Sequence, residues 1–299
     1  MENKSEQQRS GRFSVFALRI LGSLPLSFSH ALGIFICKLL WLIKNREQRI
    51  TEVNIRKCFP SMPADERITF GRESLLETGK GMAELAWVWH HPEDALAITQ
   101  CEAPEFHQAL ESGKPIIVLA PHLGCWEVLN FWLASHTNMH AMFAPSGLAR
   151  LDDLIKSSRE KLGSTMHPAT ARGVATLVRA LKKGHALTAI LPDQVADPRS
   201  GVFADFYGTP AWTGTLSSKL IQQTGAQVFM AFAKRLPNAS GYQIVMQAPD
   251  EQIYSEDIET SVRALNKSIE KLISEAPEQY LWSYKRFRVR PKGEPDPYK

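Results

Sequence analysis

The fold class is indicated most directly by the segment Pro115-Ile-Ile-Val-Leu-Ala-Pro121, which is followed at once by His122-Leu-Gly-Cys-Trp-Glu127. Its apolar run is short and continuous, which is typical of a strand buried on both faces of a sheet. Residues 123–134 predict a helix directly after that strand. A buried strand that leads straight into a helix is the unit from which α/β folds are built.

The rest of the chain repeats this alternation of strands and helices. Strands are predicted at residues 140–143, 185–191, 227–234 and 242–247, and helices at residues 64–89, 152–162, 171–183, 213–224 and 255–274. A loop rich in Asp, Pro and Gly is predicted at residues 193–212. The pattern predicts an α/β fold with a mainly parallel central sheet flanked by helices. We expect two parts, a membrane-anchoring segment at residues 1–43 and one α/β domain at residues 44–299.

Composition narrows the class of protein. The chain has 299 residues, of which 44% are hydrophobic and 22% charged, and these values exclude a disordered chain or a multi-span membrane protein. The 35 Lys and Arg exceed the 31 Asp and Glu by four. This surplus is too small to predict a nucleic-acid partner, but it suits anionic lipid or an acidic protein. The four cysteines have no metal-binding spacing, so reduced thiols and no metal site are expected.

The N-terminal region predicts a membrane anchor. Residues 24–43 are apolar with few interruptions, about the length that spans a bilayer. Lys38 would be costly inside the hydrocarbon, and Pro25 would break a helix at residues 13–24 from a second one. A true span and a hairpin lying in the membrane interface both remain open, and a buried core hairpin is the alternative. The basic residues that follow, from Lys44 to Lys57, indicate the cytoplasmic side.

Two predicted strand ends carry polar side chains, and in open α/β sheets chemistry gathers at such ends. His122 follows the first strand, and Asp193 and Gln194 follow another. If Gly124 bends the chain, Glu127 can accept a hydrogen bond from one imidazole nitrogen and leave the other nitrogen free as a base. The sequence therefore predicts a His122–Glu127 dyad. Cys125 as a nucleophile is the weaker alternative.

Several ordered blocks resemble one family. His122–Glu127 is similar to the HX4(D/E) motif of glycerolipid and lysophospholipid acyltransferases, and the whole chain resembles the bacterial late lipid A acyltransferases. The blocks that carry this resemblance are Asn54-Ile55 with Cys58-Phe59-Pro60, Glu84, Arg159 before Lys161-Leu162-Gly163, Asp193-Gln194 with Gly201-Val202-Phe203, Phe206-Tyr207-Gly208 and Pro210-Ala211, and Gln279-Tyr280-Leu281-Trp282 with Lys285-Arg286-Phe287.

The resemblance implies an O-acyltransferase of the bacterial inner membrane, with its catalytic domain on the cytoplasmic face. It implies transfer of laurate or myristate from acyl carrier protein to a hydroxyl of a Kdo-bearing lipid A precursor, with no cofactor. His122 and Glu127 would be catalytic, and backbone N–H groups after His122 would bind the oxyanion. Arg159 would hold an anionic group of the acceptor, while Asp193 and Gln194 would position it.

The expected partners are acyl carrier protein, the lipid A precursor and membrane lipids. Acyl carrier proteins are acidic, so a basic docking patch is expected, with the candidates Lys182, Lys183, Lys285, Arg286, Arg288 and Arg290. Two other functions remain open. One is an acyltransferase that acts on a phospholipid or an ornithine lipid, and the other is a non-catalytic lipid-binding protein of the membrane surface.

Overall fold

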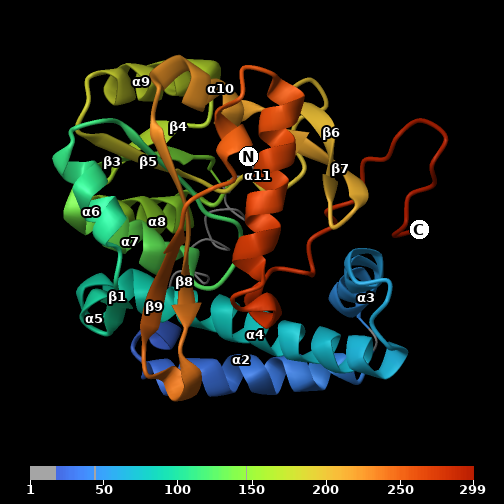
Figure 1. The fold of residues 1–299 in the computed structure, drawn as a ribbon. Helices are drawn as coiled ribbons and strands as arrows, with labels where there is room; N and C mark the ends of the chain where they lie inside the picture. The colour runs from blue at the N-terminus through green and yellow to red at the C-terminus, as the bar shows by residue number, and fades with distance from the viewer. Residues whose placement is uncertain (1–17, 44, 146) are drawn as a thin grey trace, which may run out of the picture.

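The computed structural model describes residues 18–43, 45–145 and 147–299 (Figure 1). The predicted α/β fold is confirmed, because a mostly parallel sheet lies between helices. The sheet has seven strands in the order β1-β9-β8-β2-β5-β3-β4. Their bounds are β1 Thr99–Cys101, β2 Ile116–Leu119, β3 Asn138–Phe143, β4 Thr165–Pro168, β5 Ala186–Ile190, β8 Gln227–Arg235 and β9 Tyr242–Gln247.

The helices cover both faces of this sheet. The longer ones are α2 Leu26–Trp41, α3 Arg46–Cys58, α4 Ala64–His90, α6 Pro104–Glu111, α7 Trp126–His136, α8 Ala149–Glu160, α9 Ala171–Lys182, α10 Leu216–Thr224 and α11 Ile258–Ile273. The short helices are α5 Pro92–Ala97, η1 Pro237–Ala239, η2 Glu251–Tyr254 and η3 Pro277–Gln279. Helices α2 and α4 run side by side along one edge of the molecule (Figure 1).

Strand β2 is the centre of the core, as its apolar run predicts. It pairs in parallel with β5 on one side and β8 on the other, and all four of its residues are buried. Alternate side chains of a strand point to opposite faces. Ile117 and Leu119 therefore pack in one cluster with residues of α9 and α11, whereas Ile116 and Val118 pack in a second cluster with α6 and α7.

One predicted loop contains regular structure. Strands β6 Gly201–Phe206 and β7 Thr209–Gly214 form an antiparallel hairpin that begins inside the predicted loop at residues 193–212 and ends two residues beyond it. Tyr207 and Gly208, at φ +50° and +70°, make a tight turn with the left-handed backbone that two-residue hairpins favour. The Asp, Pro and Gly residues of this segment obscured its strand pattern, in which buried Ala204 and Phe206 alternate with exposed neighbours. The predicted helix at residues 213–224 consequently begins later, at Leu216.

Two other differences concern the sheet. The short strands β1 and β4 lie in segments that the sequence pattern did not identify as strands. In addition, β8 and β9 are antiparallel, as a short connection between adjacent strands requires. The remaining predicted strands pair in parallel, with β2 and β5 as neighbours. This pairing places the ends of β2 and β5 next to each other.

The predicted membrane span is not confirmed. Among the described residues no one helix combines the length and hydropathy that crossing a bilayer requires; α2 and α3 meet the criterion only jointly, with a bend of 87° between them. Helix α2 instead lies against α4, where a Cβ on Gly33 would come within 2.2 Å of the Gly79 carbonyl oxygen. Residues 13–17 of the predicted helix at residues 13–24 lie outside the described residues.

Candidate active site

His122 and Asp193 come together at the carboxyl ends of two neighbouring strands. Leu119 at the end of β2 is in register with Ile190 at the end of β5, and the Ala120 N–H donates to the Ile190 carbonyl. His122 lies three residues beyond β2, and Asp193 lies three residues beyond β5. The pairing of the strands therefore brings two side chains that are 71 residues apart into contact.

Asp193 holds His122 at two points. One carboxylate oxygen of Asp193 lies 2.8 Å from the His122 Nδ1, and the other accepts the His122 backbone N–H at 3.0 Å. The side chain of Asp193 is only 3% exposed, and that of His122 is 17% exposed. An Nδ1–H that donates to a carboxylate leaves Nε2 with a lone pair. His122 is thus fixed in the tautomer that a general base needs.

The charge state of Asp193 supports this arrangement. Burial by itself would raise the pKa of Asp193, but the charge of His122 and its side-chain and backbone hydrogen bonds outweigh burial. The pKa of Asp193 consequently lies below its ordinary value. Asp193 remains a carboxylate at neutral pH and can stabilise an imidazolium on His122.

Gln194 faces the other nitrogen of the same ring. Its Nε2 lies 3.1 Å from the His122 Nε2. An amide NH2 group only donates, so the His122 Nε2 accepts, in agreement with the tautomer that Asp193 sets. A substrate hydroxyl that reached His122 Nε2 would take the place of the Gln194 amide.

Glu127 does not make the predicted hydrogen bond to His122. Its carboxylate accepts two bonds from Arg159, from Nε at 3.0 Å and from a terminal nitrogen at 2.5 Å. Glu127 lies in the first turn of α7 and is 1% exposed, and Arg159 lies near the end of α8. The pairing follows from burial, because a buried carboxylate needs a close cation and Asp193 already occupies the imidazole Nδ1.

Arg159 therefore pairs with Glu127 inside the protein. Its expected contact with an anionic group of the acceptor stays a prediction. Burial would lower the pKa of Arg159, but the Glu127 carboxylate raises it above its ordinary value. A planar guanidinium that donates two bonds to one carboxylate fixes the distance and angle between α7 and α8.

A tight turn joins β2 to α7 and holds His122 in place. Gly124 has φ +61°, and a Cβ there would come within 2.1 Å of the Ala233 carbonyl oxygen. The Cys125 N–H donates to that same carbonyl, and the Gly124 N–H donates to the Gln279 carbonyl. These two amides are therefore already used inside the protein, and the expectation that backbone N–H groups after His122 bind an oxyanion stays a prediction for the first residues of α7. The turn also explains why α7 begins at Trp126 and not at Leu123.

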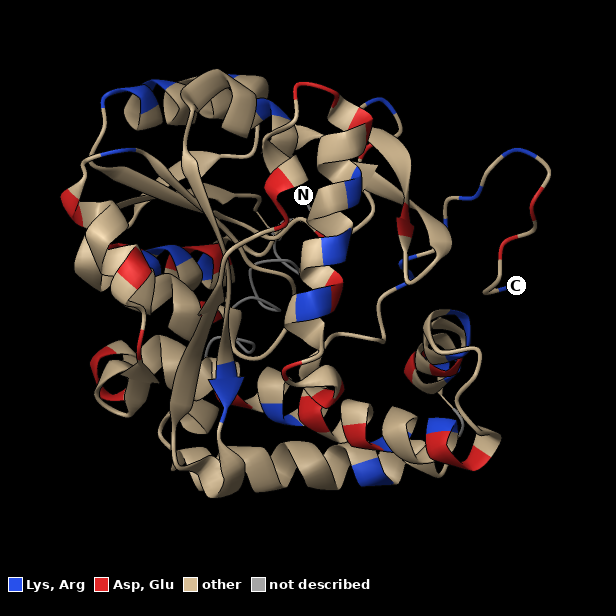
Figure 2. Ribbon diagram, in the orientation of Figure 1, with Lys and Arg blue, Asp and Glu red and all other residues tan. Residues whose placement is uncertain are grey.

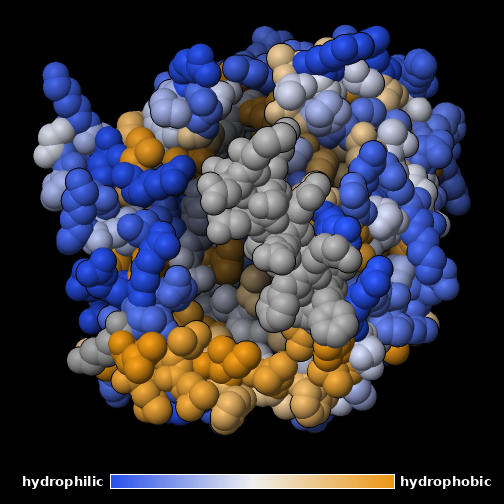
Figure 3. Space-filling model, turned by 180° about the vertical axis from the view of Figure 1, so that it is seen from behind, coloured by the Kyte–Doolittle hydropathy of each residue, from blue (hydrophilic) through white to orange (hydrophobic). Residues whose placement is uncertain are grey.

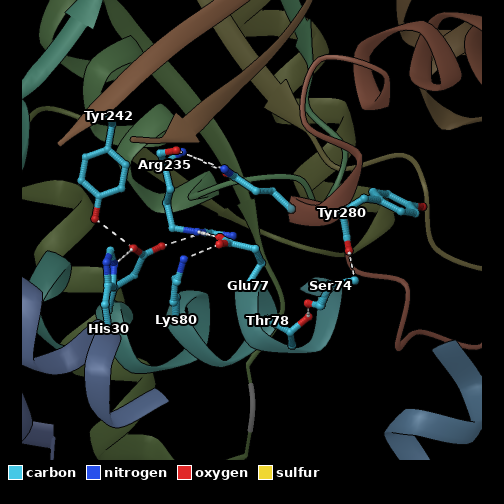
Figure 4. A network of polar contacts seen from close by, with 10 residues as sticks. His30, Ser74, Glu77, Thr78, Lys80, Arg235, Tyr242 and Tyr280 are labelled. Carbon is cyan, nitrogen blue, oxygen red and sulfur yellow. Dashed lines mark hydrogen bonds and ion pairs between the residues drawn. The ribbon is translucent and has the colours of Figure 1, made fainter. Parts of the chain in front are cut away.

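A buried polar network supports this turn from below (Figure 4). The Gln279 side chain accepts the Arg235 N–H at 2.9 Å and donates to the Arg235 carbonyl at 3.0 Å. The Arg235 guanidinium in turn donates to Glu77 at 3.1 Å and Glu84 at 2.9 Å. Glu84 also contacts the His30 Nε2 of α2 at 2.8 Å. The network thus connects α2 and α4 to the segment that binds the His122 turn.

The sequence reasoning missed most of this network. Glu84 and Gln279 enter the sequence analysis only through the family resemblance, and Arg235 has no sequence pattern that singles it out. Burial would raise the pKa of Glu84, but Arg235 and His30 lower it below its ordinary value, so Glu84 is a buried anion. A signal in the sequence was the spacing of Glu77 and Glu84, which are seven residues apart and therefore lie on one face of the predicted helix.

His122 lines a cavity of about 20 Å³, enough for about one water molecule. Glu77, Thr78, Met82 and Arg235 also line this cavity. Cys125 is not a nucleophile in this geometry, because it is fully buried and burial raises the pKa of its thiol well above the ordinary value. The described residues include no cluster of His, Cys, Asp and Glu that could hold a metal ion.

Two candidates for the basic docking patch are engaged inside the protein. Arg286 is 2% exposed and donates to the Trp212 carbonyl and the Thr213 hydroxyl. Arg290 pairs with Glu294 and donates to the Pro210 carbonyl. The candidates whose side chains reach the surface are Lys182, Lys183, Lys285 and Arg288.

A histidine at the end of a parallel strand, with Nδ1 held by a buried carboxylate and Nε2 left as an acceptor, defines a class of protein. It is an α/β protein equipped to remove a proton from a hydroxyl. Residues 7–289 match the family of bacterial lipid A biosynthesis acyltransferases. Since the match covers nearly the whole chain, the protein belongs to this family and is an acyltransferase of lipid A biosynthesis.

Relatives agree with this assignment. The chain is 28% identical to the lipid A biosynthesis lauroyltransferase of Escherichia coli over 284 residues, which cover 94% of this chain and 92% of the relative. It is 26% identical to the palmitoleoyltransferase of the same organism, over 85% of this chain and 82% of the relative. It is also 26% identical to the myristoyltransferase, over 83% and 77%. The three relatives differ in the acyl group that their names state.

Proposed function

We propose that the protein transfers a fatty acyl chain from an acyl carrier protein thioester to a hydroxyl of a Kdo-bearing lipid A precursor, with laurate or myristate as the acyl group. The observation that carries this proposal is the pairing of His122 Nδ1 with buried Asp193 at 2.8 Å, which leaves Nε2 as an acceptor beside the Gln194 amide. The family assignment supplies the acyl transfer and the lipid A pathway. A thioester is an activated donor, so the reaction needs no cofactor.

In the proposed reaction, the acceptor hydroxyl takes the place of the Gln194 amide at His122 Nε2. Nε2 removes the proton as the hydroxyl oxygen attacks the thioester carbonyl. Asp193 stabilises the imidazolium that forms, and its two contacts keep the ring in position. The tetrahedral intermediate then collapses, the C–S bond breaks, and the imidazolium returns the proton to the thiolate.

The oxyanion of that intermediate needs a donor, and Gln194 is our candidate. Its Nε2 lies 3.1 Å from the reacting nitrogen of His122 before substrate arrives. Once the hydroxyl displaces it, the amide N–H remains close to the developing charge and can donate to it. Glu127 and Arg159 act as positioning residues, because their paired side chains fix α7 beside α8 and so fix the start of the helix after His122.

We further propose that the protein works at the cytoplasmic face of the bacterial inner membrane, bound to membrane lipids through its N-terminal region. Lysine and arginine positions run along α11 and gather in the C-terminal tail (Figure 2). Half-buried Lys285 and exposed Arg288, with Lys182 and Lys183 at the end of α9, are our candidates for docking acidic acyl carrier protein.

The test uses the purified protein with acyl carrier protein loaded with laurate or myristate and a Kdo-bearing lipid A precursor. Mass spectrometry should show the acceptor gaining one acyl chain, and His122→Gln should abolish the gain. A phospholipid or an ornithine lipid in place of the acceptor tests the alternative substrates. An acceptor left unmodified by wild-type protein, with either donor, would contradict the proposal.

A further inference from the structure

An apolar groove lies between α2 and α4, apart from the polar residues of the His122 site. It encloses about 360 Å³. Its walls are mainly hydrocarbon side chains from the two helices, among them Leu32, Ile36, Leu40, Leu75, Met82 and Ala83. A groove of this size and lining suits an apolar ligand, because burying apolar surface is favourable and few polar groups have to be desolvated.

The groove opens onto a hydrophobic face of the molecule. Three residues of its wall are well exposed, with Ile36 at 45%, Leu40 at 40% and Met82 at 60%. Phe28, Phe35 and Leu39 of α2 are also exposed. Figure 3 shows hydrophobic side chains gathered along this edge. An exposed apolar face of this kind marks a site that meets lipid or another protein.

The groove also adjoins the cavity that contains His122. Thr78 and Met82 of α4 line both spaces. From Met82, the groove wall extends along α4 to Leu75, seven residues or about 10 Å away along the helix axis. A ligand in the groove would therefore have one end beside the proposed base and the other end near Leu75.

Helix α2 is fixed to α4, so the groove has a firm outer wall. Gly33 lies against Gly79, and His30 contacts buried Glu84, which indicates that the two helices run antiparallel. By this register Leu40 lies near the Leu75 end of the groove. The 16 residues of α2 thus form part of a cavity wall in addition to the surface that the sequence predicts as an anchor.

A second hollow on the other side of α2 provides a contrast. It holds about 580 Å³ and is lined by charged side chains that include Glu77, Lys80 and Lys234. A hydrocarbon chain there would strip water from ionised groups, which is unfavourable. Of these two spaces beside the His122 cavity, the groove is the one suited to a hydrocarbon.

We infer that the groove between α2 and α4 binds a saturated hydrocarbon chain of a substrate, which enters through its exposed side and points its reactive end toward His122. The inference rests on the proposed acyl transfer. Two sources of the chain share this chemistry, the acyl group of the donor and an acyl chain already on the acceptor. Leu40 near the far end of the groove then limits the length of chain that fits.

A matched pair of variants tests the inference. Leu40→Trp fills the groove near its Leu75 end, whereas Leu39→Trp makes the same change on a neighbouring residue of α2 that is 50% exposed and is not part of the groove wall. Transfer is measured with donors of 10, 12, 14 and 16 carbons, and in a second arm with acceptors whose own chains are shortened. Leu40→Trp should lower kcat/KM for long chains relative to short ones by about tenfold or more.

The two arms identify the source of the chain. A change with donor length assigns the groove to the transferred acyl group, and a change with acceptor length assigns it to the acceptor. Displacement of a bound fluorescent fatty acid by dodecanoate provides a readout that does not depend on turnover, and Leu40→Trp should weaken it while Leu39→Trp should not. Equal behaviour of the two variants in all three measurements would overturn the inference. Absence of turnover in wild-type protein with intact dodecanoate binding would instead contradict the proposed function alone.

Discussion

Two acid–base pairs flank the turn after β2, and they differ in whether one of their polar atoms remains available to a substrate. His122 and Asp193 meet where two strands end, and the His122 side chain remains 17% exposed beside a cavity. Glu127 and Arg159 meet between two helices, and both Glu127 oxygens are bound by the guanidinium. The first pair keeps one nitrogen available for a proton, whereas the second leaves no oxygen of Glu127 without a strong donor.

The comparison shows that the position of a carboxylate in a sequence motif does not identify the side chain with which it pairs. Glu127 is five residues from His122 and Asp193 is 71 residues away, yet Asp193 makes the contact. Substitutions can distinguish the roles of the two pairs. A change in the first pair should act on turnover, and a change in the second should act on stability and on the placement of the turn.

The largest expected effect comes from His122→Ala. Removal of the base should lower the rate of transfer by about 10⁴-fold, the upper range for general-base catalysis, while the unfolding transition stays close to that of wild type. Steady-state transfer and thermal unfolding of the purified protein measure the two quantities. Cys125→Ala is the control and should retain most activity. Full activity of His122→Ala, or complete loss in Cys125→Ala, would contradict the assignment of the base.

Asp193→Asn should have the next largest effect on turnover. The amide can still contact Nδ1 but brings no charge, so the imidazolium is less stable and the tautomer is no longer fixed. We expect a loss of about 10²-fold or more in kcat with little change in the KM for donor. The same rates in Asp193→Asn and wild type would show that Asp193 is a turn-capping residue only.

Glu127→Gln should act mainly on stability. It leaves Arg159 without its carboxylate, and removal of one partner from a buried pair costs about 3 kcal/mol or more. Denaturant unfolding measures this cost, and the residual activity of folded protein shows whether the dyad predicted from sequence has a chemical role. A loss of activity as large as in His122→Ala, at unchanged stability, would restore Glu127 to the catalytic step.

Arg159→Lys should have a smaller effect, because the charge stays while the two-point contact is lost. Loss of one charge-assisted hydrogen bond costs about 1.5–3 kcal/mol, which corresponds to a fall in the rate of acyl transfer of roughly tenfold to a hundredfold. The ratio of acyl transfer to thioester hydrolysis by water distinguishes two roles. If Arg159 only positions the turn, both reactions should fall together. A selective loss of transfer would support the predicted contact with an anionic group of the acceptor.

The smallest effect concerns acid stability. The pKa of Asp193 is lower in the folded protein than its ordinary value of 3.8, so ionised Asp193 stabilises the fold above that pH. This contribution is lost as the pH falls from about 4 through the folded pKa. Asp193→Asn should therefore lose less stability between pH 5 and pH 3 than wild type does. Denaturant unfolding at the two pH values measures the difference, and equal losses would contradict it.

Local sequence signals predicted the parts of the fold that depend on local residues. The apolar run at β2 and the repeated strand and helix patterns predicted the alternating elements, because burial and backbone preference act over a few residues. The same signals missed the β6–β7 hairpin, where Gly, Asp and Pro interrupt the alternating apolar residues. They also placed the start of α7 too early, because the bend at Gly124 depends on the Ala233 carbonyl of a distant strand.

For the site, the sequence by itself determined that His122 follows a buried strand and that Asp193 and Gln194 follow another. Only the tertiary structure decided which carboxylate meets the imidazole. Pairing of β2 with β5 brings Asp193 to Nδ1, and the position of the end of α8 brings Arg159 to Glu127. Hydrogen bonds are short and directional, so the partners of a polar side chain depend on neighbours that strand order supplies and that spacing along the chain cannot reveal.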